Sequence, residues 1–121
     1  MNIARSGDFI VTSESTASTT YTDLATVGPT IARVADGDYL VMFGCHITGQ
    51  GGAVSRSVNG AAADDAHSMQ TNESSAAVVR GEMLTLKNNH NSTIQLKYRN
   101  LGGAGPNFER RWLVIIRIST G

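Results

Sequence analysis

The stretch IQLKYRNLGGAGPNFERRWLVIIRI, residues 94–118, decides the fold class of this 121-residue chain. Residues 94–99 alternate apolar and polar side chains with the period of a strand, and a glycine-rich segment, residues 102–105, follows them. A phosphate-binding glycine loop opens a helix, because the N–H groups at the helix start hold the phosphate. Here a β-rich run follows the glycines, and neither Gly-Lys-Ser/Thr nor G-x-G-x-x-G is present. The sequence therefore predicts a hairpin connection between two strands, with glycines at positive φ.

The strand after these glycines is apolar on both faces. One face carries the even-numbered residues from Trp112 to Ile118, and the other carries Leu113 and Ile115. One of the two faces fits the core of a sandwich. In so small a domain the other face is covered either by another subunit or by a long loop of the same chain, and the sequence leaves both open.

Strand signals recur along the rest of the chain, separated by turn signals such as Asp36-Gly37-Asp38 and Asn59-Gly60. We expect strands over residues 19–24, 30–34, 39–47, 53–58, 76–79, 82–86, 92–99 and 107–118. No segment has a convincing amphipathic helical pattern. Residues 1–17 are predicted to form an extended N-terminal arm, and residues 18–121 one domain. About eight strands at this spacing indicate an all-β antiparallel sandwich or barrel.

Charge and composition exclude several classes of partner. Ten basic residues balance ten acidic ones, so the chain lacks the electrostatic footprint of a nucleic-acid-binding protein. A neutral chain is poorly protected against association, which favours a protein that assembles. No apolar run approaches the length of a membrane span, and the first residues lack the apolar region of a secretory signal. We expect neither nucleic acid nor membrane as a partner.

Metal and catalytic motifs are missing from the sequence. Cys45 and His46 are adjacent on an expected strand, so their side chains point to opposite faces and cannot share an ion. His67 and His90 are isolated, and neither G-x-S-x-G nor H-E-x-x-H occurs. The acidic pair at 64–65 is interpreted as part of a solvated loop. We predict no catalytic residue, no metal site and no cofactor.

The aromatic residues allow two interpretations. They could form a platform for stacking sugars, but their spread over several strands is more typical of a core. The residues concerned are Tyr21, Tyr39, Phe43, Tyr98, Phe108 and Trp112.

Three stretches resemble a family of small bacteriophage virion domains: STTYTDLATVGPTIARV (18–34), GDYLVMFGCHI (37–47) and residues 84–118. The matching motifs are Tyr21-Thr22-Asp23-Leu24 with Val27-Gly28-Pro29, and Leu96-Lys97-Tyr98-Arg99 with Phe108 and Arg110-Arg111. The resemblance implies a jelly roll of the tumour-necrosis-factor or C1q type, usually trimeric. This family occurs in head decoration proteins, head fibres and tail-associated proteins. Residues 49–80 match nothing in its outline.

The resemblance implies a non-enzymatic, homotrimeric decoration or cement protein on the outer capsid surface. Its partners would be two sister copies and the major capsid protein of a phage; its location would be the virion, after synthesis in the bacterial host cytoplasm. The expected capsid-binding residues of the arm are Ile3, Phe9, Ile10 and Val11. The expected subunit interface comprises Tyr98, Phe108, Arg110, Trp112 and Val114.

Two alternatives stay open. The first is a tail or fibre-tip module that binds a receptor or carbohydrate through loops 49–53 and 59–75 at one end of the sandwich. The second is an esterase or polysaccharide hydrolase, for which the sequence offers no catalytic constellation.

Overall fold

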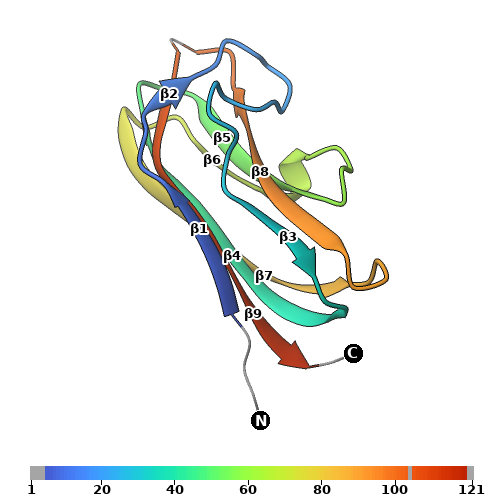
Figure 1. Ribbon diagram of the computed structural model, residues 1–121. Helices are drawn as coiled ribbons and strands as arrows, with labels where there is room; N and C mark the ends of the chain where they lie inside the picture. Colours follow the sequence, from blue (N-terminus) through green and yellow to red (C-terminus); the bar gives the residue numbers. More distant parts are fainter. Residues whose placement is uncertain (1–4, 104, 120–121) are drawn as a thin grey trace.

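Two antiparallel sheets face each other in the computed structural model, which describes residues 5–103 and 105–119 (Figure 1). The strands are β1 (Arg5–Ile10), β2 (Glu14–Ser15), β3 (Thr30–Val34), β4 (Gly37–Thr48), β5 (Gly52–Val58), β6 (Ser68–Thr71), β7 (Ser75–Leu86), β8 (Ser92–Asn100) and β9 (Asn107–Ser119). A single turn of 3-10 helix, η1 (Asp65–His67), is the only helix in these two ranges. No helix of the described residues is long and apolar enough to cross a membrane. The predicted all-β class is confirmed.

The strand order is that of a jelly roll. The larger sheet runs β1-β9-β4-β7, with β2 also paired to β9, and the smaller sheet runs β3-β8-β5-β6. From β2 onward, each connection except β5–β6 carries the chain from one sheet to the other. Eight main strands wound in this alternation form a double-sheet jelly roll.

The glycine segment after β8 connects the two sheets. Gly102 and Gly105 have φ of 97° and 89°, as predicted. However, β8 lies in the smaller sheet and β9 in the larger, so the predicted hairpin is corrected to an inter-sheet loop. The same turn chemistry serves both kinds of connection, because glycine relieves the backbone wherever φ is positive.

Alternate residues of the central strands build the core between the sheets. On β4 the odd-numbered residues from Tyr39 to Ile47 are buried, and on β8 the even-numbered residues from Ile94 to Tyr98 are buried. Tyr98 packs against Phe108 with ring centroids 5.0 Å apart, so this aromatic pair joins the two sheets.

The first residues of the chain are extended and lie on the larger sheet. Strand β1 pairs with β9 from Arg5↔Ile116 to Ile10↔Arg111. Without β1, strand β9 would be a sheet edge with unpaired backbone groups, which explains why the predicted arm packs there and does not project freely. Residues 1–4 lie outside the described ranges.

The segment at residues 19–24 differs from its prediction as a strand. Only Thr22 pairs there, in an isolated bridge to Tyr98, and the segment otherwise runs as a loop beside the part of β8 that extends past β3. Leu24 turns into the core and is 5% exposed, so the ladder cannot continue past it.

Candidate functional site

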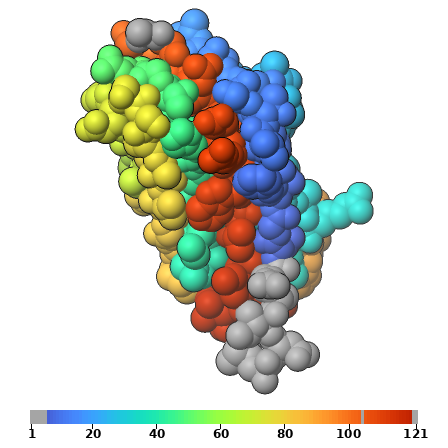
Figure 2. Space-filling view, turned by 90° about the vertical axis from the view of Figure 1, so that its left-hand side faces the viewer, coloured from blue at the N-terminus to red at the C-terminus, as the bar shows by residue number. Residues whose placement is uncertain are grey.

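The outer face of the larger sheet is apolar across four strands, which lie side by side in Figure 2. Cross-strand rows bring the side chains together: Leu40 lies between Met83 and Ile116, and Met42 lies beside Val114. We call this surface the apolar face; its members are Phe9, Leu40, Met42, Val79, Met83, Trp112, Val114 and Ile116.

The apolar face is partly exposed to solvent. Phe9, Val79 and Met83 are 56%, 51% and 59% exposed on the two edge strands, and each lies opposite an apolar residue or glycine of the neighbouring strand. With strands about 4.8 Å apart and a rise of about 3.3 Å per residue, the rows from Leu40 to His46, the polar row of His46 included, project to roughly 400 Å². A patch of that size is in the range of the largest apolar patch on a typical monomer, which is often functional.

Trp112 lies on this face close to the backbone of β4. It is cross-strand from Gly44 on β4 and from Phe9 on β1. A Cβ atom on Gly44 would collide with the carbonyl oxygen of Val78 and lie 3.0 Å from the indole ring. Glycine therefore lets the indole rest on the backbone of β4, and a shallow hollow beside it is lined by Phe9, Val79 and Trp112 among others.

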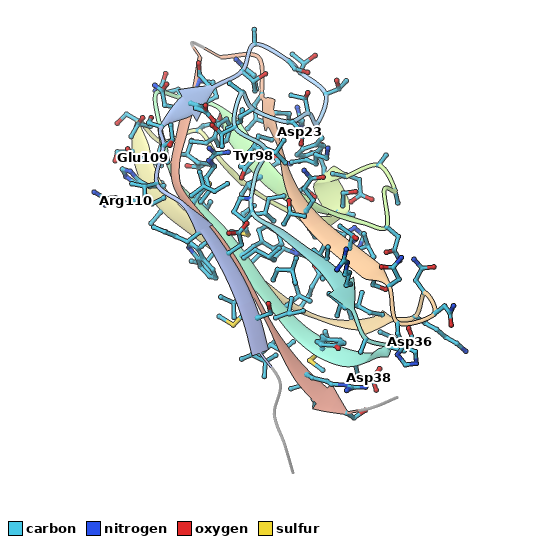
Figure 3. The ribbon with its side chains drawn as sticks, in the orientation of Figure 1. Asp23, Asp36, Asp38, Tyr98, Glu109 and Arg110 are labelled. Atoms are coloured by element: carbon cyan, nitrogen blue, oxygen red, sulfur yellow. The ribbon has the colours of Figure 1, made fainter. Side chains whose placement is uncertain are left out.

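One end of the apolar face has a polar rim. The Nδ1 atom of His46 lies 2.7 Å from Oε1 of Glu109, and its Nε2 atom lies 2.8 Å from Oγ of Ser75. Glu109 and Arg110 project on this side of the molecule (Figure 3). Arg110 is exposed and has a φ of 48°, which marks a bulge in β9.

The chain of hydrogen bonds from Ser75 through His46 to Glu109 has the connectivity of a Ser-His-acid relay. Sequence motifs missed it because its members are 29 and 63 residues apart and lie on three neighbouring strands. Acyl transfer also needs preorganised donors for an oxyanion. The three strands use their backbone groups to pair with one another around these residues. We therefore interpret these hydrogen bonds as a structural link between the side chains of three neighbouring strands.

The residues of the predicted subunit interface lie in different parts of the structure. Trp112 and Val114 lie on the apolar face, and Arg110 lies at its rim. Tyr98 and Phe108 are fully buried in the core and have no surface to offer another subunit, so their assignment is corrected. The bulge explains the error for Phe108, because one extra residue at Arg110 reverses the alternation before it.

The predicted capsid-binding arm is only partly described. Val11 is 64% exposed just after β1, and Ile10 is half-buried. Phe9 is cross-strand from Trp112 and so extends the apolar face. Ile3 lies outside the described residues.

A buried arginine fixes the segment that follows this arm. Arg111 has no exposed surface, although it lies in the charged run of residues 109–111. Its Nη2 atom donates to Oε1 of Glu14 over 2.9 Å, and its Nη1 atom donates to the carbonyl oxygen of Thr26 over 3.1 Å. The guanidinium also lies 5.3 Å from the ring centroid of Tyr98. Strand β2 and the loop after it are thereby tied to the core.

The loops predicted to bind a receptor are unequal in exposure. Residues 51–53 are buried at the start of β5, whereas residues 59–75 form an exposed loop with η1 and the short strand β6. Strand β6 and η1 were not predicted, because their residues are polar and carry no clear period. Among the described residues, no group of three or more His, Cys, Asp or Glu side chains is placed to hold a metal ion.

No family model and no curated protein sequence matches the chain. Among solved structures, it is similar to the C-terminal CBM6 of LamC, a marine laminarinase from Zobellia galactanivorans, with a TM-score of 0.43 and 12% identity over 93% of this chain and 100% of that one. It is also similar to an exo-beta-1,3-galactanase from Phanerochaete chrysosporium, with a TM-score of 0.44 and 13% identity over 96% of this chain and 29% of that one. A family 35 carbohydrate-binding module from Clostridium thermocellum gives a TM-score of 0.37 and 11% identity over 98% of this chain and 99% of that one.

Similarities this low carry no argument about what the present chain binds or does. None of these three is a phage protein by its description, and the assignment to a virion therefore remains a proposal.

Proposed function

We propose that the chain is a non-catalytic structural subunit that forms a homotrimer through the apolar face and decorates the outer surface of a phage capsid. The observation that carries the proposal is the apolar face itself. The described segments of the chain leave Phe9, Val79 and Met83 largely exposed, so a cover from the chain's own loops is not favoured. Burial of these residues against other copies of the chain fits better.

A second copy is the partner whose chemistry fits this face. On β4, β7 and β9 its rows from Leu40 to Gly44 contain only apolar residues and glycine, and the chain has a formal net charge of zero. Neither property repels the apolar faces of the two neighbouring copies that each copy contacts in a trimer. Burying a footprint of roughly 400 Å², with the polar row of His46 included, contributes at most about 10 kcal/mol per copy at 25 cal/mol per Å². That gain is of the same order as the cost of association, which is about 4–15 kcal/mol, so the assembly is expected to depend on concentration.

The capsid setting rests on the resemblance to phage virion domains. In this proposal Phe9 belongs to the contact between copies, because its neighbour on the sheet is Trp112. Val11, the most exposed of the described large apolar residues, is then the described arm residue best placed to contact the capsid. Ile3 and Ile10 complete the proposed capsid contact.

Light scattering at micromolar concentration tests the assembly. The wild-type chain is expected to have the mass of three copies, and Met42→Lys and Val114→Lys are expected to give folded single copies. Val27→Lys is the matched control, because Val27 is 50% exposed but lies in the loop between β2 and β3, outside the apolar face. A wild-type chain that stays monomeric would contradict the assembly. Electron microscopy of the phage that encodes the chain, showing no density on the capsid, would contradict the location.

A further inference from the structure

A second hollow lies on the other side of the sandwich. Residues of the loop before β3 and of the loop that carries η1 form it, with one residue of β8: Thr19, Thr20, Tyr21, Ala63, Asp64, Asp65 and Arg99. It is shallow and open to solvent, with a volume of about 480 Å³. Figure 1 shows η1 beside β8, away from β1 and β9. Association through the apolar face would therefore leave this hollow open.

A hydrogen-bond network around Asp65 connects three side chains of the hollow. Arg99 donates to both carboxylate oxygens, from Nε over 3.0 Å and from Nη2 over 2.9 Å. The Tyr21 hydroxyl donates to the same carboxylate over 2.6 Å, and the guanidinium lies 5.6 Å from the Tyr21 ring centroid. These bonds lower the pKa of Asp65, with Arg99 the largest cause. The three side chains are thus ordered before any ligand arrives.

Asp64 adds a carboxylate that faces the solvent. Its Oδ1 atom accepts hydrogen bonds from the backbone N–H of His67 over 3.1 Å and lies 2.7 Å from the His67 Nδ1 atom. The Asp64 side chain is 56% exposed even so, which leaves acceptor capacity at the mouth of the hollow.

The lining selects one class of ligand. Two carboxylates against one guanidinium disfavour phosphate and other anions. A metal ion is disfavoured because Asp65 is already bound by Arg99 and Tyr21. A neutral molecule rich in hydroxyl groups fits the remaining donors and acceptors, since sugars combine hydroxyl rims with apolar C–H surfaces that suit an aromatic ring beside fixed polar groups.

We propose that this hollow binds a neutral oligosaccharide, with the Tyr21 ring supplying apolar contact, Asp64 accepting sugar hydroxyl groups and Arg99 donating to them. The inference stands on the hollow alone and does not require the trimer. If the chain does assemble through the apolar face, each assembly displays one such site per copy.

A microarray of neutral and acidic oligosaccharides, probed with the full chain, tests the inference, followed by titration calorimetry with any neutral glycan retained. Asp64→Ala removes the acceptor, and Ala63→Phe fills the hollow without removing a hydrogen bond of the network. Each is expected to weaken binding at least tenfold. Asp23→Ala is the matched control, because Asp23 pairs with Lys97 on the same side of the sandwich and does not line the hollow. It is expected to change affinity by less than twofold.

Retention of no neutral glycan, or of acidic glycans only, would overturn the inference. So would neutral-glycan binding that survives both variants unchanged. The oligomeric mass of each variant, measured in parallel, separates this result from the assembly: loss of the sugar with the mass unchanged concerns the hollow alone.

Discussion

Replacing Glu14 by glutamine should destabilise the protein, because Glu14 is the carboxylate that balances the buried charge of Arg111. Removing one partner of a buried ion pair costs about 3–5 kcal/mol. The Glu14 side chain is 16% exposed, and glutamine keeps an acceptor oxygen, so we expect a smaller cost of about 2–3 kcal/mol. For a domain of this size, that corresponds to a fall in Tm of roughly 6–15 °C.

The same pair predicts how stability depends on pH. Burial alone would raise the pKa of Glu14, but hydrogen bonds from Thr26 and the attraction of Arg111 outweigh it and lower the pKa below its ordinary value of 4.5. A carboxylate whose pKa is lowered by folding contributes stability above the unfolded pKa, and that stability is lost as pH falls through the folded pKa. The wild-type chain should therefore lose this contribution below about pH 4.5. The stability of Glu14→Gln should not show this decrease at acidic pH.

Thermal unfolding between pH 3 and pH 8, at one fixed protein concentration, measures both effects. Glu73→Gln is the matched control, because Glu73 is exposed in the loop between β6 and β7. It should shift Tm by no more than about 2 °C. If the Tm of Glu14→Gln at pH 7 matched that of this control, or if its Tm fell at acidic pH as much as that of the wild type, the ion pair of Glu14 and Arg111 would not stabilise β2 as described.

Three further outcomes are expected. Gly44→Ala should cost about 1–3 kcal/mol in denaturant unfolding, because the new methyl group collides with the carbonyl oxygen of Val78; an unchanged midpoint would refute this. Burial raises the pKa of the Cys45 thiol to about 12, so it should resist a thiol reagent at pH 8 in the folded chain and react once the chain is unfolded in guanidinium. Glu82→Gln should lower stability by about 2 kcal/mol, because Glu82 on β7 accepts two hydrogen bonds from Arg56 on β5 and so joins the sheets; equal Tm values would argue against that link.

The strands were largely predictable because successive side chains of a strand point to opposite faces, so that buried positions recur at every second residue. Alternation places Ile94, Leu96 and Tyr98 on one side of β8, and the structure buries all three. The apolar second face of β9 was also visible, since Trp112 and Val114 follow the same period as the buried residues between them.

The sequence did not show which strands pair with one another in a sheet. A glycine turn reverses the chain whether the next strand joins the same sheet or the opposite one, so Gly102 and Gly105 do not distinguish a hairpin from an inter-sheet loop. The relay through His46 and the network around Asp65 depend on which strands become neighbours. Their members are too far apart in the chain for any local pattern to reveal them.

The bulge in β9 explains both the buried Phe108 and the polar rim. Arg110 and Arg111 together oppose the single residue Cys45 on β4, so the alternation of side chains reverses at this point. Phe108 consequently enters the core against Tyr98, while Glu109 turns outward to His46. In a regular strand, Phe108 would share the outer face with Trp112, and the core would lose the ring that joins its two sheets. The bulge thus places Phe108 in the core and Glu109 on the outer face. In the sequence it coincides with the run of three charged residues, 109–111.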